Sequence, residues 1–124
     1  MERSWPKELF YHRDHCWVKV ENNNQVIIGL DEFFIKKAGE INKVKLPFEG
    51  DEIKVNESFG EVLTVSGDIK VVAPLSGEIM EVNLNLEDDP QVLMKDPYQE
   101  GWMMKVIASN LEDEIEMLIK GKSS

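Results

Sequence analysis

The side chains near the start of the chain that could bind a metal are His12, Asp14, His15 and Cys16, which carry nitrogen, oxygen and sulfur donors. A structural zinc site needs about four such donors converging on one point. Alternate residues of a strand face opposite sides, so a strand here would turn His12 and His15 away from each other. No second ligand cluster follows. The sequence therefore predicts no metal site.

Cys16 is the only cysteine, so it cannot form an internal disulfide, which agrees with a reducing compartment. A lone cysteine usually packs as a small apolar side chain, and no catalytic partner for it is apparent in the sequence. The chain has no nucleophile elbow, phosphate-binding loop or Cys-x-x-Cys pair. We expect no catalytic residues and a protein that is not an enzyme.

The first half of the chain predicts a hairpin and then a short helix. Residues 15–20 and 25–30 are rich in strand formers, and the polar cluster between them favours a turn. Asp31 then stands where an N-cap would, and Gly39 follows the last helical turn. These signals predict a helix over residues 31–38.

Beyond residue 40 the pattern changes to short strands separated by Gly and Pro, a spacing typical of a small sandwich or barrel. An acidic start before Pro90 predicts a short helix over 88–94, and Asn110 could cap a C-terminal amphipathic helix over 111–120. The expected strands are 41–46, 59–65, 69–73, 78–83 and 102–107.

Two similar segments flank the central pair of strands. Pro47-Phe48-Glu49-Gly50 and Pro74-Leu75-Ser76-Gly77 each place a turn before a strand, and the strands continue alike after a one-residue gap at Asp51. One such unit cannot bury its apolar face alone, so we expect two units related by an approximate two-fold axis. Between them, Ser66-Gly67 predicts a tight two-residue turn with Ser66 exposed at the apex.

The order of the motifs resembles the H protein of the glycine cleavage system, a lipoyl-bearing carrier related in fold to lipoyl and biotinyl domains. Cys16 stands where that family usually has Glu, and Asp31 where it has Thr. The resemblance covers residues 11–108 and implies an all-β core with short helices, a flattened barrel-sandwich of two antiparallel sheets. The matching motifs are Tyr11-His12-Arg13-Asp14-His15-Cys16-Trp17-Val18, Ile28-Gly29-Leu30-Asp31, Ala38-Gly39-Glu40-Ile41, Leu46-Pro47, Gly50-Asp51-Glu52, Glu57-Ser58-Phe59-Gly60, Ala73-Pro74-Leu75-Ser76-Gly77-Glu78, Val82-Asn83, Asp96-Pro97-Tyr98 and Gly101-Trp102.

The resemblance also shows where this chain departs from the family. The family attaches lipoate to a lysine eight residues before the proline of the second turn, and here that position holds Ser66. Leu63 replaces the acid that resembling proteins use for recognition by the attachment enzyme. Lys70 shares strand parity with Ser66 but lies four residues farther along, about 13 Å away. We therefore expect no lipoate, with Lys70 as the alternative attachment site.

Composition limits the partners. The 124 residues fit one domain, which we expect to span 1–124, and carry a net charge of −10, which disfavours nucleic acid. No apolar stretch reaches the roughly 20 residues that cross a bilayer, and the start lacks a signal-peptide core. We expect a soluble, cytoplasmic protein. The acidic stretch Glu87-Asp88-Asp89 reads as a helix start and a solvated face, or as a docking surface for a basic partner.

Two functions are consistent with these observations. The first is an H-protein-like scaffold that lacks the lipoylated lysine and binds other proteins, such as glycine cleavage or lipoate-handling enzymes. The alternative is a working carrier that shuttles the aminomethyl group of glycine cleavage on a non-standard attachment residue.

Overall fold

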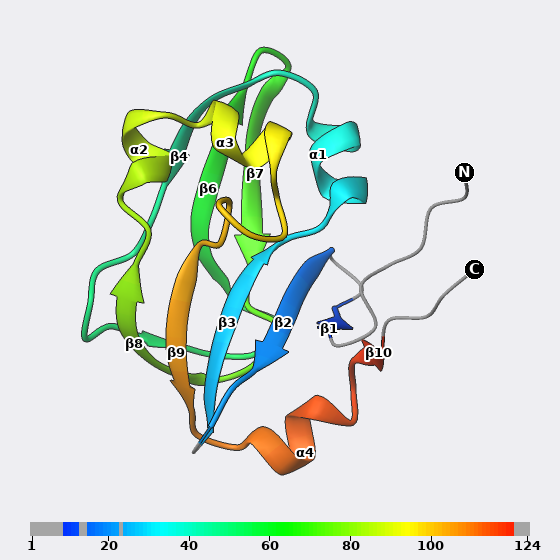
Figure 1. The fold of residues 1–124 in the computed structure, drawn as a ribbon, viewed down its shortest axis with the longest axis vertical. Helices are drawn as coiled ribbons and strands as arrows, with labels where there is room; N and C mark the ends of the chain where they lie inside the picture. Colours follow the sequence, from blue (N-terminus) through cyan, green and yellow to red (C-terminus); the bar gives the residue numbers. More distant parts are fainter. Residues whose placement is uncertain (1–8, 13–14, 23, 121–124) are drawn as a thin grey trace.

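The structure is a computed structural model that describes residues 9–12, 15–22 and 24–120. Its strands form two antiparallel sheets, one with the order β10-β1-β2-β3-β9-β8-β5 and one with the order β4-β6-β7 (Figure 1). The strands are β1 (Leu9–Tyr11), β2 (Cys16–Val20), β3 (Gln25–Leu30), β4 (Ile41–Lys45), β5 (Glu52–Ile53), β6 (Ser58–Thr64), β7 (Gly67–Val72), β8 (Gly77–Val82), β9 (Met104–Ala108) and β10 (Ile119–Lys120). The helices are α1 (Glu32–Ala38), α2 (Asn85–Asp88), α3 (Gln91–Lys95) and α4 (Leu111–Ile115).

The main core joins the two sheets. Val18, Ile28 and Val106 from the larger sheet and Val62 and Val71 from the smaller one are all buried in a single apolar cluster. Inward-facing apolar residues alternate with more exposed ones along β9, as expected of strands with one buried face. An all-β core with two antiparallel sheets and short helices is confirmed, and the sheets do not close into a complete barrel.

The two similar segments lie side by side. β5 and β8 pair in antiparallel register, with Glu52 opposite Glu78, and these are the equivalent positions of the two segments. The backbone N–H of Gly50 donates to the Ile79 carbonyl at 2.8 Å, and the Ile79 N–H donates to the Asp51 carbonyl at 2.8 Å. This arrangement is the one that a local two-fold relation between the segments requires.

The prediction for α1 is confirmed at both ends. Asp31 is the N-cap, and its Oδ1 accepts a hydrogen bond from the Phe34 backbone N–H at 2.9 Å. Gly39 ends the helix with φ of 77°, a conformation that glycine adopts without strain, and its N–H donates to the Ile35 carbonyl.

The helix predicted over 88–94 is instead two short helices, α2 and α3. The Asp89 N–H donates to the Asn85 carbonyl at 2.7 Å, which closes the last turn of α2. Pro90, which has no N–H to continue that helix, is the N-cap of α3. The proline therefore separates two helices, where we had predicted that it begins one.

The helix predicted over 111–120 is wrong beyond its first turns. α4 ends at Ile115, and Ile119–Lys120 forms β10, which pairs with β1. Asn110 is at the N-cap position, but its side chain makes no capping hydrogen bond. Leu111 and Leu118 still pack against the main core. The reason is that the edge of β1 presents backbone N–H and C=O groups, which an extended segment can pair with and a continued helix could not.

The other predicted strands are confirmed within one or two residues at their ends. No helix in the described part of the chain is long and apolar enough to cross a membrane. The β6–β7 hairpin forms one end of the molecule, at the top of Figure 1, and α4 lies at the other. The hairpin tip therefore stands at the far end of the fold from α4.

Candidate functional site: the hairpin tip

The tip is positioned by the register of β6 and β7. Val62 and Val71 are buried and fix which face of the hairpin points into the core. A one-residue slip would expose both, so the register is strongly specified. Leu63 is half-buried on the opposite face and lies across from Asp68. The hairpin is thus held rigidly at its base while its tip stands clear of the core.

The turn residues are Val65 and Ser66, one residue earlier than the Ser66-Gly67 turn that we predicted. Thr64 and Gly67 form the closing pair of the hairpin. The Thr64 hydroxyl donates to the Gly67 carbonyl at 2.8 Å and accepts from the Ser66 N–H at 3.1 Å. Gly67 takes the positive φ, 135°, that follows the turn. The glycine is needed because a side chain at this φ would be strained.

The apex presents an apolar side chain and a hydroxyl to solvent. Val65 is 65% exposed, and Ser66 is also exposed. The Val65 N–H is held by the Glu40 carbonyl at 3.2 Å, which ties the apex to the segment before β4. Among the residues that the structure describes, none accepts a hydrogen bond from the Ser66 hydroxyl, so the apex presents no activated nucleophile there.

Lys70 lies on β7, opposite Glu61 of β6, and is exposed. Four residues separate it from Ser66, about 13 Å along an extended chain. Because Ser66 belongs to the turn and not to β7, the predicted strand parity between Ser66 and Lys70 is wrong. Lys70 is therefore a side chain of the strand and not part of the apex.

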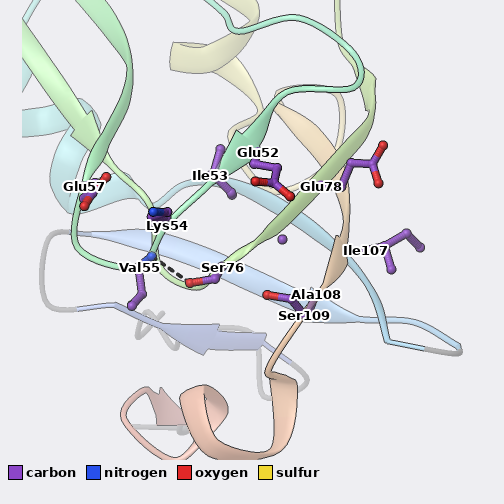
Figure 2. Close-up of a pocket in the computed structure, with 11 residues that line it drawn as sticks. Glu52, Ile53, Lys54, Val55, Glu57, Ser76, Glu78, Ile107, Ala108 and Ser109 are labelled. Carbon is purple, nitrogen blue, oxygen red and sulfur yellow. Dashed lines mark hydrogen bonds between the residues drawn. The ribbon is translucent and has the colours of Figure 1, made fainter.

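A hollow that the sequence did not reveal lies beside β5, away from the tip. Figure 2 shows its lining, which includes Glu52, Glu78 and Ile107, and its volume is about 630 Å³. Gly77 lies in its wall, where an added Cβ would stand only 2.4 Å from the Ile107 carbonyl oxygen. The pairing of the two similar segments was the signal that could have located it.

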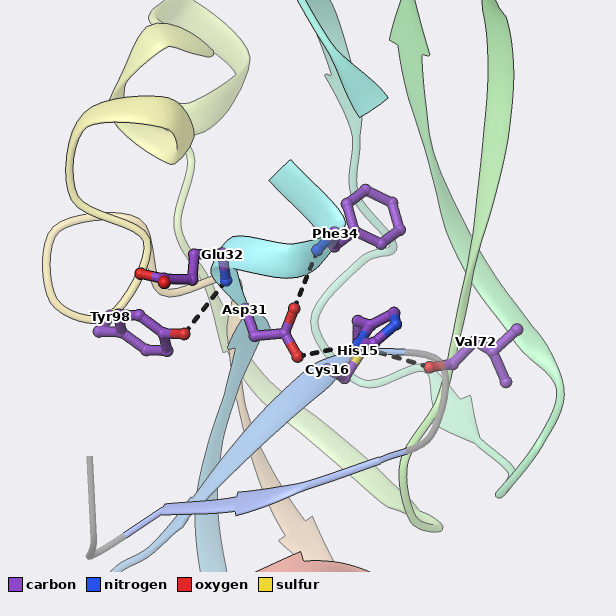
Figure 3. A network of polar contacts seen from close by, with 7 residues as sticks. All are labelled: His15, Cys16, Asp31, Glu32, Phe34, Val72 and Tyr98. Carbon is purple, nitrogen blue, oxygen red and sulfur yellow. Dashed lines mark hydrogen bonds and ion pairs between the residues drawn. The ribbon is translucent and has the colours of Figure 1, made fainter. Parts of the chain in front are cut away.

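The candidate metal ligands are held apart by different partners. His15 Nδ1 lies 3.2 Å from Asp31 Oδ2, whereas His12 Nε2 lies 2.8 Å from Asn56 Oδ1. Cys16 is fully buried, and its thiol donates to the Val72 carbonyl at 3.3 Å (Figure 3). Asp14 lies outside the described residues. No group of three or more His, Cys, Asp or Glu side chains suited to a metal occurs among the residues that the structure describes.

Asp31 and Tyr98 form a polar network around the start of α1 (Figure 3). Burial raises the pKa of the Asp31 carboxyl above its usual value, and the Phe34 N–H and His15 oppose that shift only in part. The Tyr98 hydroxyl accepts from the Glu32 N–H at 3.1 Å, and burial raises the pKa of Tyr98. The sequence predicted the capping role of Asp31 but not its contact with His15.

Comparison with known proteins agrees with this architecture. The family described as "Glycine cleavage H-protein" matches residues 9–124. The glycine cleavage system H protein of Carboxydothermus hydrogenoformans is 44% identical over 114 residues, which is 92% of this chain and 86% of that protein. The H protein of Bacillus licheniformis is 43% identical over 116 residues, 94% of this chain and 90% of that protein.

A solved structure gives the same result in three dimensions. The crystal structure of a glycine cleavage system H protein from Mycobacterium marinum matches with a TM-score of 0.81 and 31% identity, covering 85% of this chain and 87% of that one. The lipoyl-type barrel-sandwich that we expected is thereby confirmed. The chain belongs to the glycine cleavage H-protein family, whose members carry lipoate and are not themselves catalysts.

Proposed function

We propose that this chain keeps the scaffold of an H protein without the lipoyl arm and works by binding other proteins. The observation that carries the proposal is Ser66 at the exposed apex of the β6–β7 hairpin, the position that the sequence resemblance assigns to the family's lipoylated lysine. In this proposal residues 1–124 act as one domain, with no cofactor attached.

The chemistry of attachment supports the proposal. A lysine amine forms a stable amide with lipoate, whereas the Ser66 hydroxyl is a weak nucleophile and would give a hydrolysable ester. Leu63 stands in place of the acid that resembling proteins present to the attachment enzyme. Since Leu63 is half-buried and uncharged, it offers no charge for recognition. Both changes act against lipoylation.

The proposed partners are enzymes of glycine cleavage or enzymes that handle lipoate, in the cytoplasm. A scaffold with the right shape and no arm would occupy the surface where a lipoylated H protein binds, or would escort that protein to its enzymes. The exposed Val65 gives the apex an apolar contact that needs no lipoyl group. Neither nucleic acid nor a membrane is a partner in this proposal.

The alternative function is a carrier whose lipoyl group is attached at a non-standard residue, and Lys70 is the candidate for that residue. It is exposed, and it belongs to the same hairpin as Ser66. In such a protein the arm would leave from the strand, about 13 Å from the apex. A glycine cleavage assay rebuilt from its component enzymes separates the two functions, since only the second predicts activity with the wild-type chain.

A lipoylation assay tests the role of position 66 directly. The purified chain is incubated with a lipoate ligase, lipoate and ATP, and its intact mass is measured. We expect no adduct on the wild-type chain and one adduct on the double variant Ser66→Lys/Leu63→Glu. Val65→Lys is the matched control, because it places a lysine on the other turn residue.

The outcomes are distinct. Modification of the double variant alone supports position 66 as the attachment position that this chain has lost. Modification of wild type, or equal modification of Val65→Lys and the double variant, contradicts it. A wild-type adduct that disappears in Lys70→Arg would establish the alternative function.

A further inference from the structure

The structure points to a binding surface that lies away from the hairpin tip, around β5. β5 is the last strand of the larger sheet, so within the part of the chain that the structure describes one of its edges has no strand partner. A second hollow, of about 420 Å³, shares Glu52, Ile53, Lys54 and Glu57 with the hollow of Figure 2. The two hollows therefore meet along β5, and together we call them the β5 groove.

The carboxylates of this groove are arranged unfavourably for the isolated chain. Glu52 and Glu78 are directly opposite each other in the β5–β8 register, and both are exposed. Like charges at paired positions destabilise a sheet. In the described part of the chain neither residue has an ion pair, and Asp51 and Glu57 bring the carboxylates of the groove to four against the one ammonium of Lys54. The groove therefore carries an excess of negative charge.

The wall of the groove suits an aliphatic side chain with a charged end. Val55 and Ile107 are half-buried and line the hollow, next to the small residues Gly77 and Ala108. Lysine and arginine pack their methylene stems on apolar surface of this kind and keep the charged group outside. The Glu52 and Glu78 carboxylates belong to the same lining and stand at opposed positions of adjoining strands (Figure 2).

The open edge of β5 favours a ligand with an extended backbone. An unpaired strand edge presents backbone N–H and C=O groups to which an extended segment can add. Alternate side chains of that segment would then face the groove. We propose that the β5 groove binds an extended segment of a partner protein with lysine or arginine at alternate positions. This proposal does not depend on whether the hairpin tip carries lipoate.

The test uses a synthetic peptide, acetyl-Lys-Val-Lys-Val-Lys-amide, titrated into the full isotope-labelled chain and followed by amide NMR shifts. We expect saturable shifts in residues 52–55, 76–78 and 107–109. Raising the salt from about 20 to about 500 mM should weaken binding, because exposed charges are screened. The control peptide, acetyl-Glu-Val-Glu-Val-Glu-amide, should not bind.

Two double variants show whether the β5 groove or the overall negative charge of the protein is responsible for peptide binding. Glu52→Lys/Glu78→Lys should weaken binding at least about tenfold, since two attractions become two repulsions. Glu87→Lys/Asp88→Lys makes the same change of charge on α2 and should change binding less than about twofold. If the groove variant does not fold, Glu52→Gln/Glu78→Gln replaces it, with an expected loss of about threefold.

Three results would overturn the proposal. One is equal weakening by the groove and α2 variants, which would mean that the peptide responds to net charge alone. Another is a set of shifts confined to α2 or spread evenly over the acidic surface. The third is the absence of saturable binding at low salt.

Discussion

Replacing Ser76 with alanine should destabilise the fold by about 2 kcal/mol, because this side chain fastens α4 to the turn before β8. The Ser76 hydroxyl accepts from the Val55 N–H at 3.0 Å and donates to Glu114 Oε2 at 2.9 Å. The Ser76 backbone N–H donates to Glu114 Oε1 at 2.7 Å, and this bond survives the substitution. Ser76→Ala therefore removes two hydrogen bonds, one of them to a carboxylate.

The magnitude follows from those two bonds. A neutral hydrogen bond contributes about 1 kcal/mol, and one to a charged group about 1.5–3 kcal/mol. The lower end of the second range applies because Ser76 and Glu114 are only half-buried and water can replace part of the interaction. For a chain of this length, about 2 kcal/mol corresponds to a fall in Tm of roughly 8 °C.

The assay is urea unfolding monitored by circular dichroism, supported by a thermal melt. Ser109→Ala is the matched control, since Ser109 lines the same groove and its side chain has no hydrogen bond in the part of the chain that the structure describes. It should change the free energy of unfolding by less than about 0.5 kcal/mol. A double-mutant cycle with Glu114→Gln should give a coupling energy of about 1 kcal/mol.

A loss of stability in Ser76→Ala no larger than that in Ser109→Ala would contradict this prediction. The same loss in Ser76→Ala with and without Glu114→Gln would also contradict it, because the two side chains would then not interact. A change in the urea m-value would indicate altered compactness and not the loss of these bonds.

Three further predictions concern Asp31 at the start of α1, Gly77 in the wall of the β5 groove and Ser66 at the hairpin tip. Asp31→Asn keeps the cap acceptor without the charge. Because burial raises the pKa of Asp31, the stabilising contribution of this carboxyl is present below the unfolded pKa of 3.8 and is lost as pH rises through the folded pKa. In urea unfolding, the stability of the variant relative to wild type should therefore increase from about pH 3 to about pH 7. A relative stability that falls over that range would contradict the burial argument. Gly77→Ala should cost about 3 kcal/mol or fail to fold, since its Cβ would meet the Ile107 carbonyl oxygen at 2.4 Å; a normal melting curve would show that β8 and β9 can separate locally. Ser66→Lys should leave the free energy of unfolding within about 0.5 kcal/mol of wild type, because position 66 is exposed, and a larger loss would mean that the serine has a structural role at the turn.

Local signals in the sequence located the elements with strong caps and regular alternation. α1 was predictable because Asp31 and Gly39 mark its two ends, and the likeness of the segments containing Pro47 and Pro74 predicted an approximate two-fold relation, although not that their strands pair directly. The hairpin turn was misplaced by one residue because Gly67 suggested a glycine inside the turn. In the structure the glycine follows the turn, where its positive φ is required.

Long-range contacts decided the features that the sequence did not reveal. β10 forms only because β1 offers it an edge, and neither strand has a strong pattern of its own. The contact between His15 and Asp31 joins residues that are 16 positions apart. The sequence pattern around His15 raised the question of a metal site and gave no sign of this pair. The β5 groove depends on the register between two separate segments, which a linear pattern does not specify.

The most direct test of the central claim is the intact mass of this protein purified from its own host. We predict the mass of the unmodified chain, with no lipoyl adduct, because we propose that Ser66 stands at the family's attachment position. A lipoyl-sized adduct on any residue, located by fragmentation and Lys70 first among the candidates, would contradict the account and make the chain a working carrier.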